Sequence, residues 1–211
     1  LFLGADAGLK NTEGNSNVFI GLQSGKSNTT GENNVFLGNM SGYSNVDGGV
    51  NVFLGHYSGM SNANGNANVF LGSYSGYHNT SGSNNNFIGS SAGYNNDDGI
   101  NNIYLGNGAG FNGTSSSNNV FLGYQTGYNN NGSYNIMMGD SAGFNNTSGQ
   151  YNIFMGYQSG NQNTDGSSNT FLGYNAGRNY TTGDYNTFIG YQSGLASAVS
   201  FGTGNNNVGM G

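Results

Sequence analysis

The hydrophobic residues of this chain fall in short clusters that recur at a fixed interval. The segment NVFLG at residues 51–55 returns at residues 68–72, and the Gly residues that end these clusters lie 17 residues apart almost throughout. A unit of 17 residues is too short for a helix-turn-helix repeat, but it suits one coil of a β-solenoid. The period therefore predicts an all-β chain, a β-roll in which each repeat forms one coil.

Each cluster reads as a short strand that is apolar on both faces. Side chains alternate between faces along a strand, so Val35 and Leu37 share one face and Phe36 takes the other. A strand buried on one face alternates apolar with polar residues, which these strands do not do. A coil of 17 residues encloses little space, so we expect one face to fill the interior and the other to need a second surface.

The aromatic column between the aliphatic residues is the face that we predict to pack against a second surface. Stacked at a strand spacing of ~4.8 Å, these rings would form a continuous apolar stripe, and such a stripe normally marks an interface. We expect identical chains to pack around it, most simply as a parallel homotrimer. The alternative is a monomer with a wider, flattened coil that buries both columns. The predicted interface residues are Phe19, Phe36, Phe53, Phe70, Phe87, Phe121, Phe154, Phe171 and Phe188.

Gly and Asn recur at positions that predict the corners of the coil. Gly permits positive φ and close backbone approach, and Asn tolerates the left-handed region and bonds to nearby backbone. A Gly ends each strand, a second follows four residues later, and a third precedes the recurring Asn by three residues except at Ser116. The predicted corner residues are Asn17, Asn34, Asn51, Asn68, Asn85, Asn102, Asn119, Asn135, Asn152, Asn169 and Asn186.

The second half of each repeat predicts a second short strand. The residue before the second Gly is always small, as at Ser24 and Ala92, which indicates tight space opposite a large side chain. The residue after that Gly is often aromatic, as at Tyr77 and Phe111, and these rings are expected to form a surface ladder or a seam between subunits.

The spacing also divides the chain. Residues 1–194 are predicted to form a continuous solenoid of about eleven to twelve repeats, and residues 195–211 an irregular loop and a last row leading to a further section. The single one-residue deletion, before Gly139, falls in a turn where it need not move a strand. Because Leu1 lies inside a repeat, we expect the chain to belong to a longer protein.

Composition narrows the function classes. The 211 residues include 41 Gly and 41 Asn, a content typical of disorder, but 13 Phe, 15 Tyr and a fixed period indicate a folded repeat array. The net charge is -6 with only three Lys and Arg residues, which cannot neutralise a nucleic-acid backbone. No apolar run reaches the ~18 residues that a membrane helix needs.

Catalytic and metal-binding patterns are not apparent. The nine acidic residues form no repeated pair; only Asp97 and Asp98 are adjacent, which indicates a solvated turn. His56 and His78 stand in different columns without acidic or Cys companions at metal spacing. We therefore predict no enzymatic activity, no metal and no cofactor.

A binding function is the alternative from another class. A Thr column recurs in one turn, with interruptions, and could in principle match an ice lattice, while a Tyr ladder could stack on a glycan. Either function would be carried by a monomer. The Thr column comprises Thr12, Thr29, Thr80, Thr114, Thr147, Thr164 and Thr181.

The repeated phrase resembles those of bacterial surface proteins. The segment NTFLGYNAG at residues 169–177 is similar to the NTFLGYQAG arrays of tail-fibre-like surface proteins, and NVFLG with the following A/S-G resembles the head repeats of trimeric autotransporter adhesins. The adhesin resemblance implies a parallel trimeric left-handed β-roll at the cell surface. We therefore expect an extracellular fibre or adhesin segment, with its own copies as partners, a host surface or glycan as target, and no nucleic acid or membrane contact.

Overall fold

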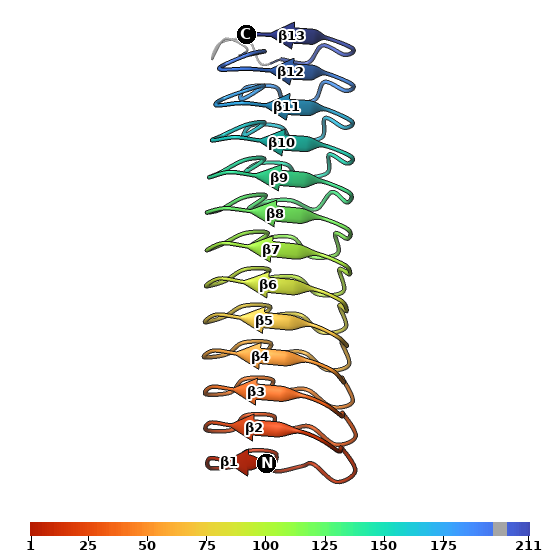
Figure 1. Cartoon of the computed structure of the whole chain (residues 1–211). Coiled ribbons are helices and arrows are strands. Elements are labelled where there is room, and N and C mark those ends of the chain that lie inside the picture. Colours follow the sequence, from red (N-terminus) through yellow and green to blue (C-terminus); the bar gives the residue numbers. More distant parts are fainter. Residues whose placement is uncertain (196–201) are drawn as a thin grey trace.

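The computed structural model describes residues 1–195 and 202–211, which form a β-solenoid (Figure 1). All thirteen strands belong to one sheet in chain order, and every neighbouring pair is parallel. The described residues include no helix, and therefore no helix that could span a membrane. The strands are β1 (Phe2–Leu3), β2 (Val18–Ile20), β3 (Val35–Leu37), β4 (Val52–Leu54), β5 (Val69–Leu71), β6 (Asn86–Ile88), β7 (Ile103–Leu105), β8 (Val120–Leu122), β9 (Ile136–Met138), β10 (Ile153–Met155), β11 (Thr170–Leu172), β12 (Thr187–Ile189) and β13 (Val208–Met210).

Each coil contains one strand, so the prediction of two strands per coil is wrong. The second half of a coil is a series of turns: in the coil after β2, Lys26 N donates to Gln23 O and Asn28 N to Gly25 O, at 3.3 and 3.1 Å. Gln23 and Gly25 have φ of 56° and 57°, which an extended strand excludes. The turns still bond to the next coil, since Gly25 N donates to Ser41 O at 2.9 Å.

The strands keep one register along the whole rod. Equivalent positions pair throughout, as in Val52 with Val69, and the deletion leaves Val120 opposite Ile136. The deletion was therefore correctly placed in a turn. After the longer spacing, β13 still pairs with β12, with Val208 opposite Thr187. The predicted irregular loop falls largely on residues 196–201, which lie outside the described part of the chain.

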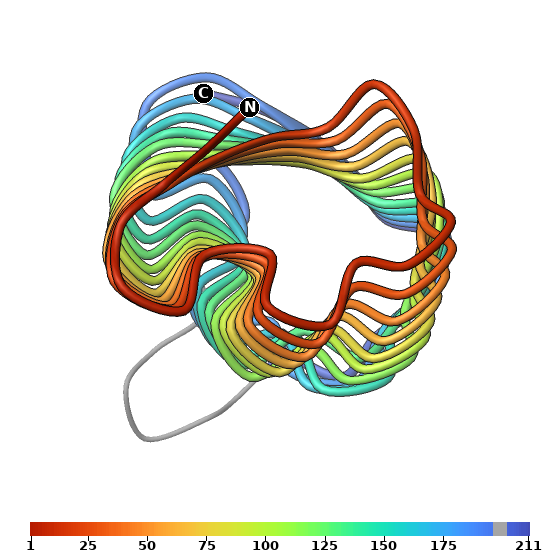
Figure 2. The same ribbon diagram turned by 90° about the horizontal axis from the view of Figure 1, so that it is seen from below.

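The aromatic column fills the interior of the coil. Figure 2 looks along the axis onto the closed outline that the backbone of each coil traces. Eight rings from Phe2 to Phe121 stack inside it at centroid distances of 4.7–5.0 Å, with Tyr104 among them. Met137 takes the ring position in β9, and Phe154, Phe171 and Phe188 resume the stack.

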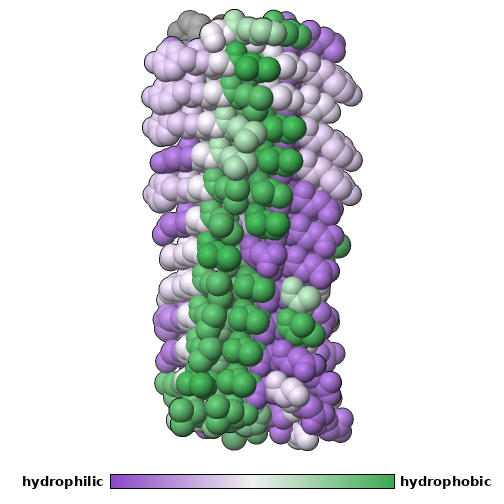
Figure 3. Space-filling view, in the orientation of Figure 1, coloured by the Kyte–Doolittle hydropathy of each residue, from purple (hydrophilic) through white to green (hydrophobic). Residues whose placement is uncertain are grey.

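The aliphatic residues on either side of each ring point outward. In β3, Phe36 is fully buried while Val35 and Leu37 are half-buried, and the pattern repeats from strand to strand. The space-filling view shows the result as an apolar stripe along the strand face (Figure 3). The sequence correctly separated the two faces, and the structure adds that the aliphatic face is the outward one.

Candidate functional site

The predicted interface residues belong to the core of a single chain. From Phe19 to Phe171 the Phe side chains of the interface set have no exposed surface, and Phe188 is nearly as buried. Rings enclosed by their own coil cannot contact another copy, so the Phe column is not an interface. One ring per coil fits because the residues opposite are small, and this confirms the expected tight space at positions such as Ser24 and Ala92.

Two Gly columns are required by this packing. A Cβ on Gly76 would lie 2.4 Å from a ring carbon of Phe70, and φ is +57° there. A Cβ on Gly72, where φ is +140°, would lie 2.5 Å from the carbonyl oxygen of Gly89 in the next coil. The second Gly therefore presses on the aromatic stack, and the strand-ending Gly permits neighbouring coils to approach.

The predicted corner Asn residues form a hydrogen-bond ladder that we call the first Asn ladder. Asn51 is typical: its Oδ1 accepts from Asn68 N at 2.9 Å, and its Nδ2 donates to Gly65 O at 2.8 Å. These Asn side chains are buried, and their backbone is not left-handed; positive φ falls on the preceding residue, such as Val50. The corner position was predicted, but its physical role is side-chain bonding to the next coil.

A second Asn ladder, which the sequence analysis missed, runs through the turns. Asn62 Nδ2 donates to Asn45 Oδ1 at 2.7 Å and to Gly65 O at 3.1 Å, so each amide links two coils. Its recurrence every 17 residues was the available signal. Its members are Asn11, Asn28, Asn45, Asn62, Asn79, Asn96, Asn130, Asn146 and Asn163.

The second Asn ladder breaks at Gly113 and at Tyr180. Asn96 Oδ1 and Asn163 Oδ1, which precede the two breaks, are buried without a hydrogen-bond partner among the described residues. A buried acceptor left unpaired costs about 1–3 kcal/mol. The two breaks are thus the places where the hydrogen bonding of the ladder is least complete.

Two further substitutions accompany the break at Gly113 in the same coil. The coil has Tyr104 at the ring position, Gly113 at the Asn position and Ser116 at the third Gly position. The hydroxyl groups of Tyr104 and Ser116 lie 3.4 Å apart, so the added phenol oxygen meets a polar group. Burial raises the pKa of Tyr104 to about 12, although hydrogen bonds with Ser116 and Asn119 offset part of this increase.

The aromatic residues after the second Gly form a half-buried ladder on the surface. A surface ladder was one of the two arrangements predicted from the sequence, the other being a seam between subunits. Five rings, Tyr77, Tyr94, Phe111, Tyr128 and Phe144, stack at 4.9–5.1 Å with interplanar angles of 3–7°. Burial is the main cause that raises the pKa of Tyr77, and the neighbouring Tyr94 raises it further. Rings this close cover one another's faces, so a sugar cannot stack between them and meets ring edges instead.

The Thr column engages the backbone of the following coil. Thr29 Oγ1 donates to Val46 O at 3.1 Å, and Thr147 Oγ1 to Thr164 O at 2.9 Å. The column lies in a turn, and the outward strand positions are aliphatic or Met except at Asn86, Thr170 and Thr187. The Thr hydroxyl groups thus already hold neighbouring coils together, which does not favour the array of free hydroxyl groups expected of an ice-binding face.

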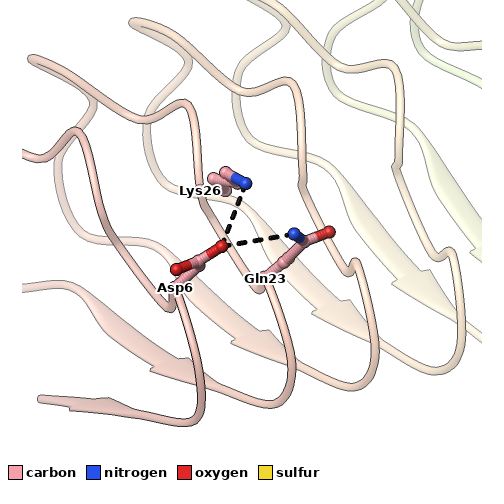
Figure 4. A network of polar contacts seen from close by, with 3 residues as sticks. All are labelled: Asp6, Gln23 and Lys26. Atoms are coloured by element: carbon pink, nitrogen blue, oxygen red, sulfur yellow. Dashed lines mark hydrogen bonds and ion pairs between the residues drawn. The ribbon is translucent and has the colours of Figure 1, made fainter.

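Within the described part of the chain, one ion pair is present, between Lys26 and Asp6 near the N-terminal end. Asp6 accepts from Lys26 Nζ at 3.0 Å and from Gln23 Nε2 at 3.3 Å, so these contacts join the first two coils (Figure 4). The hydrogen bond from Lys26 is the main cause that lowers the pKa of Asp6, and the hydrogen bond from Gln23 lowers it further. Across residues 1–195 and 202–211, no group of three His, Cys, Asp or Glu side chains is arranged to hold a metal ion.

The comparisons with known proteins identify no relative. No family model matches the chain, and no curated protein or solved structure matches it.

Proposed function

We propose that the chain is a structural rod, a segment of an extracellular fibre or adhesin. One observation carries the proposal: each strand pairs only with the strands of the preceding and following coils, in unbroken register from β1 to β13. The length of such a molecule is set by the number of coils and its cross-section by one coil. These are the properties of a spacer or shaft.

The interior supports the same proposal. Most coils repeat a Phe ring, a small residue opposite it and a first-ladder amide, and where Tyr104 or Met137 replaces Phe the rod remains continuous. Buried rings contribute roughly 1.5–3 kcal/mol each, and the two ladders satisfy backbone groups between coils. The resemblance to adhesin heads and fibre arrays agrees with a location outside the cell.

Solution scattering tests the rod, and antibody labelling tests its location. Small-angle scattering is expected to give a particle of constant cross-section, with a rod length of roughly 60 Å from thirteen rows at ~4.8 Å. Antibodies against the purified chain are expected to label intact source cells and, by immunogold microscopy, filaments. Scattering from a flexible chain would contradict the rod, and labelling only after lysis would contradict the extracellular role.

A further inference from the structure

The outward residues of the strands form a surface that we call the aliphatic stripe. It comprises the first and third residues of β2 to β12, and all of them are aliphatic or Met except Asn86, Thr170 and Thr187. Figure 3 shows it as one continuous band over the strand face. Monomeric soluble proteins rarely expose contiguous apolar patches larger than a few hundred Å². A band along the whole rod therefore calls for a partner.

Exposed Tyr residues border the C-terminal half of the stripe on both sides. Past the strands, Tyr157, Tyr174 and Tyr191 stack at 5.1 and 5.3 Å, and Tyr191 is 65% exposed. Ahead of the strands, Tyr134 and Tyr151 stack at 5.0 Å. Aliphatic residues bordered by Tyr are typical of binding surfaces, where Tyr is enriched and charge is depleted.

Charge is nearly absent from this face. No stripe position carries a charged residue, and Asp140 is the one acidic side chain in the two bordering columns. The remaining acidic residues lie in the turns, so the chain can carry a net charge of -6 while leaving this face neutral. A neutral, straight and apolar face fits a partner with the same three properties.

We propose that a second copy of this chain packs on the aliphatic stripe, face to face. The stripe with its borders spans about six residues, or roughly 20 Å, and a length of roughly 55–60 Å at the strand spacing. Covering it would bury about 1,100 Å² on each copy, or about 2,200 Å² in total, which is above the ~1,600 Å² of a standard stable interface.

A second copy also matches the stripe in shape. Its outward side chains recur at the same strand spacing over the same length, so the two sheets can interdigitate as the sheets of a β-sandwich do, ~10 Å apart. This inference rests on the proposed rod and names its partner. It replaces the Phe column by the aliphatic stripe as the surface where copies meet.

Light scattering after size exclusion tests the proposal on the full chain. The wild type is expected at about twice 21.8 kDa over a concentration series. The variant Leu105→Glu/Met138→Glu/Leu172→Glu, with changes two coils apart, is expected at 21.8 kDa. The matched control Ser81→Glu/Ser115→Glu/Ser148→Glu adds the same charge to exposed turn positions and is expected to remain a dimer.

A milder variant guards against loss of folding. Tyr124→Ser/Tyr157→Ser/Tyr174→Ser changes only exposed border residues, and it is expected to weaken dimerisation at least tenfold while circular dichroism shows unchanged thermal unfolding. A monomeric wild type would leave the stripe to a partner of different chemistry and overturn the proposal. So would a folded Glu variant that keeps the wild-type mass. In either case a rod-like scattering profile would leave the proposed function standing.

Discussion

At the scale of single residues, nearly every coil holds two non-Gly residues at positive φ; in the coil after β7, Gly108 takes the first position. Gln23 and Asn33 occupy these positions in the coil after β2, and Val50 occupies the second in the next coil with φ of 60°. Left-handed backbone costs a side-chain-bearing residue about 1–2 kcal/mol, and least for Asn. A β-branched residue at such an angle is a genuine outlier. The column therefore stores strain that differs from coil to coil.

Val50→Asn is expected to stabilise the protein by about 1 kcal/mol, because Asn accepts the left-handed backbone and Val50 is already 60% exposed. Chemical denaturation measures the change. Asn84→Val in the same column, where φ is 58°, is the mirrored control and is expected to cost about the same amount. A loss of stability in Val50→Asn would refute the strain argument.

Tyr104 gives the stability a pH dependence in alkaline solution. The folded pKa of about 12 lies above the ordinary value of 10.0, so the folded state holds the phenol proton more tightly than the unfolded state. Stability is therefore full below pH 10 and falls as the pH rises toward 12, by roughly 3 kcal/mol at most. Urea denaturation across this range measures it. Tyr104→Phe is expected to show a shallower decline, and an unchanged slope would count against the assignment.

At the scale of the coil, the two Asn ladders supply the polar half of the interior. Asn68 accepts from Asn85 N at 2.9 Å and donates to Gly82 O at 2.8 Å. Asn68→Ala leaves Asn85 N buried without an acceptor, whereas Gly82 O keeps its bond from Asn79 Nδ2 at 3.0 Å, so the expected cost is about 1–3 kcal/mol. Thermal and chemical denaturation measure the loss. Exposed Asn107→Ala is the control, expected within about 0.5 kcal/mol of wild type, and equal effects would contradict a special role for the ladder.

The sequence predicted the coil, the strand and the register, because the 17-residue period and the alternation of Val, Phe and Leu are direct physical signals. It did not predict which face turns inward, since both are apolar. The deciding contact is local: Gly76 lies against the ring of Phe70, and only a ring with Gly and a small residue opposite it fits inside. A Gly and a small residue one position apart were visible in the sequence and indicated that space.

The second half of the coil was harder to predict for a different reason. Left-handed residues there include Gln23, Tyr57 and Ser91, whose side chains give no sign of positive φ. The residues therefore read as a strand, although the backbone forms a series of turns. The second Asn ladder was visible as a column but was hidden by its breaks at Gly113 and Tyr180.

At the scale of the whole molecule, the rod is a one-dimensional stack in which each coil contacts only its neighbours. Stability in such stacks is a sum of coil and interface terms. Deleting residues 52–68 removes one full coil and joins Asn51 to Val69 in phase. The shortened chain is expected to fold, with a scattering length reduced by ~4.8 Å.

Deleting residues 52–60 is the out-of-phase control for that experiment. It removes β4 with the ring of Phe53 and part of the turns of one coil, so the remaining residues 61–68 cannot close a coil around the aromatic stack and the fold is expected to lose cooperativity. Circular dichroism and scattering compare the two deletions. Equal behaviour of both would contradict a stack built from whole coils.

The substitutions at Tyr104, Gly113 and Ser116 fall within one coil and leave the register with both neighbouring strands unchanged, and this has a consequence for how such a gene changes. A coil that keeps the register of its neighbours can be copied or lost without moving the strands on either side. Seventeen codons of three nucleotides make a cassette of 51 nucleotides, so unequal recombination between repeats stays in frame. Each event lengthens or shortens the rod by one strand spacing and leaves its cross-section unchanged. The length of the rod can therefore change while the sequence of each coil stays under the same physical constraint.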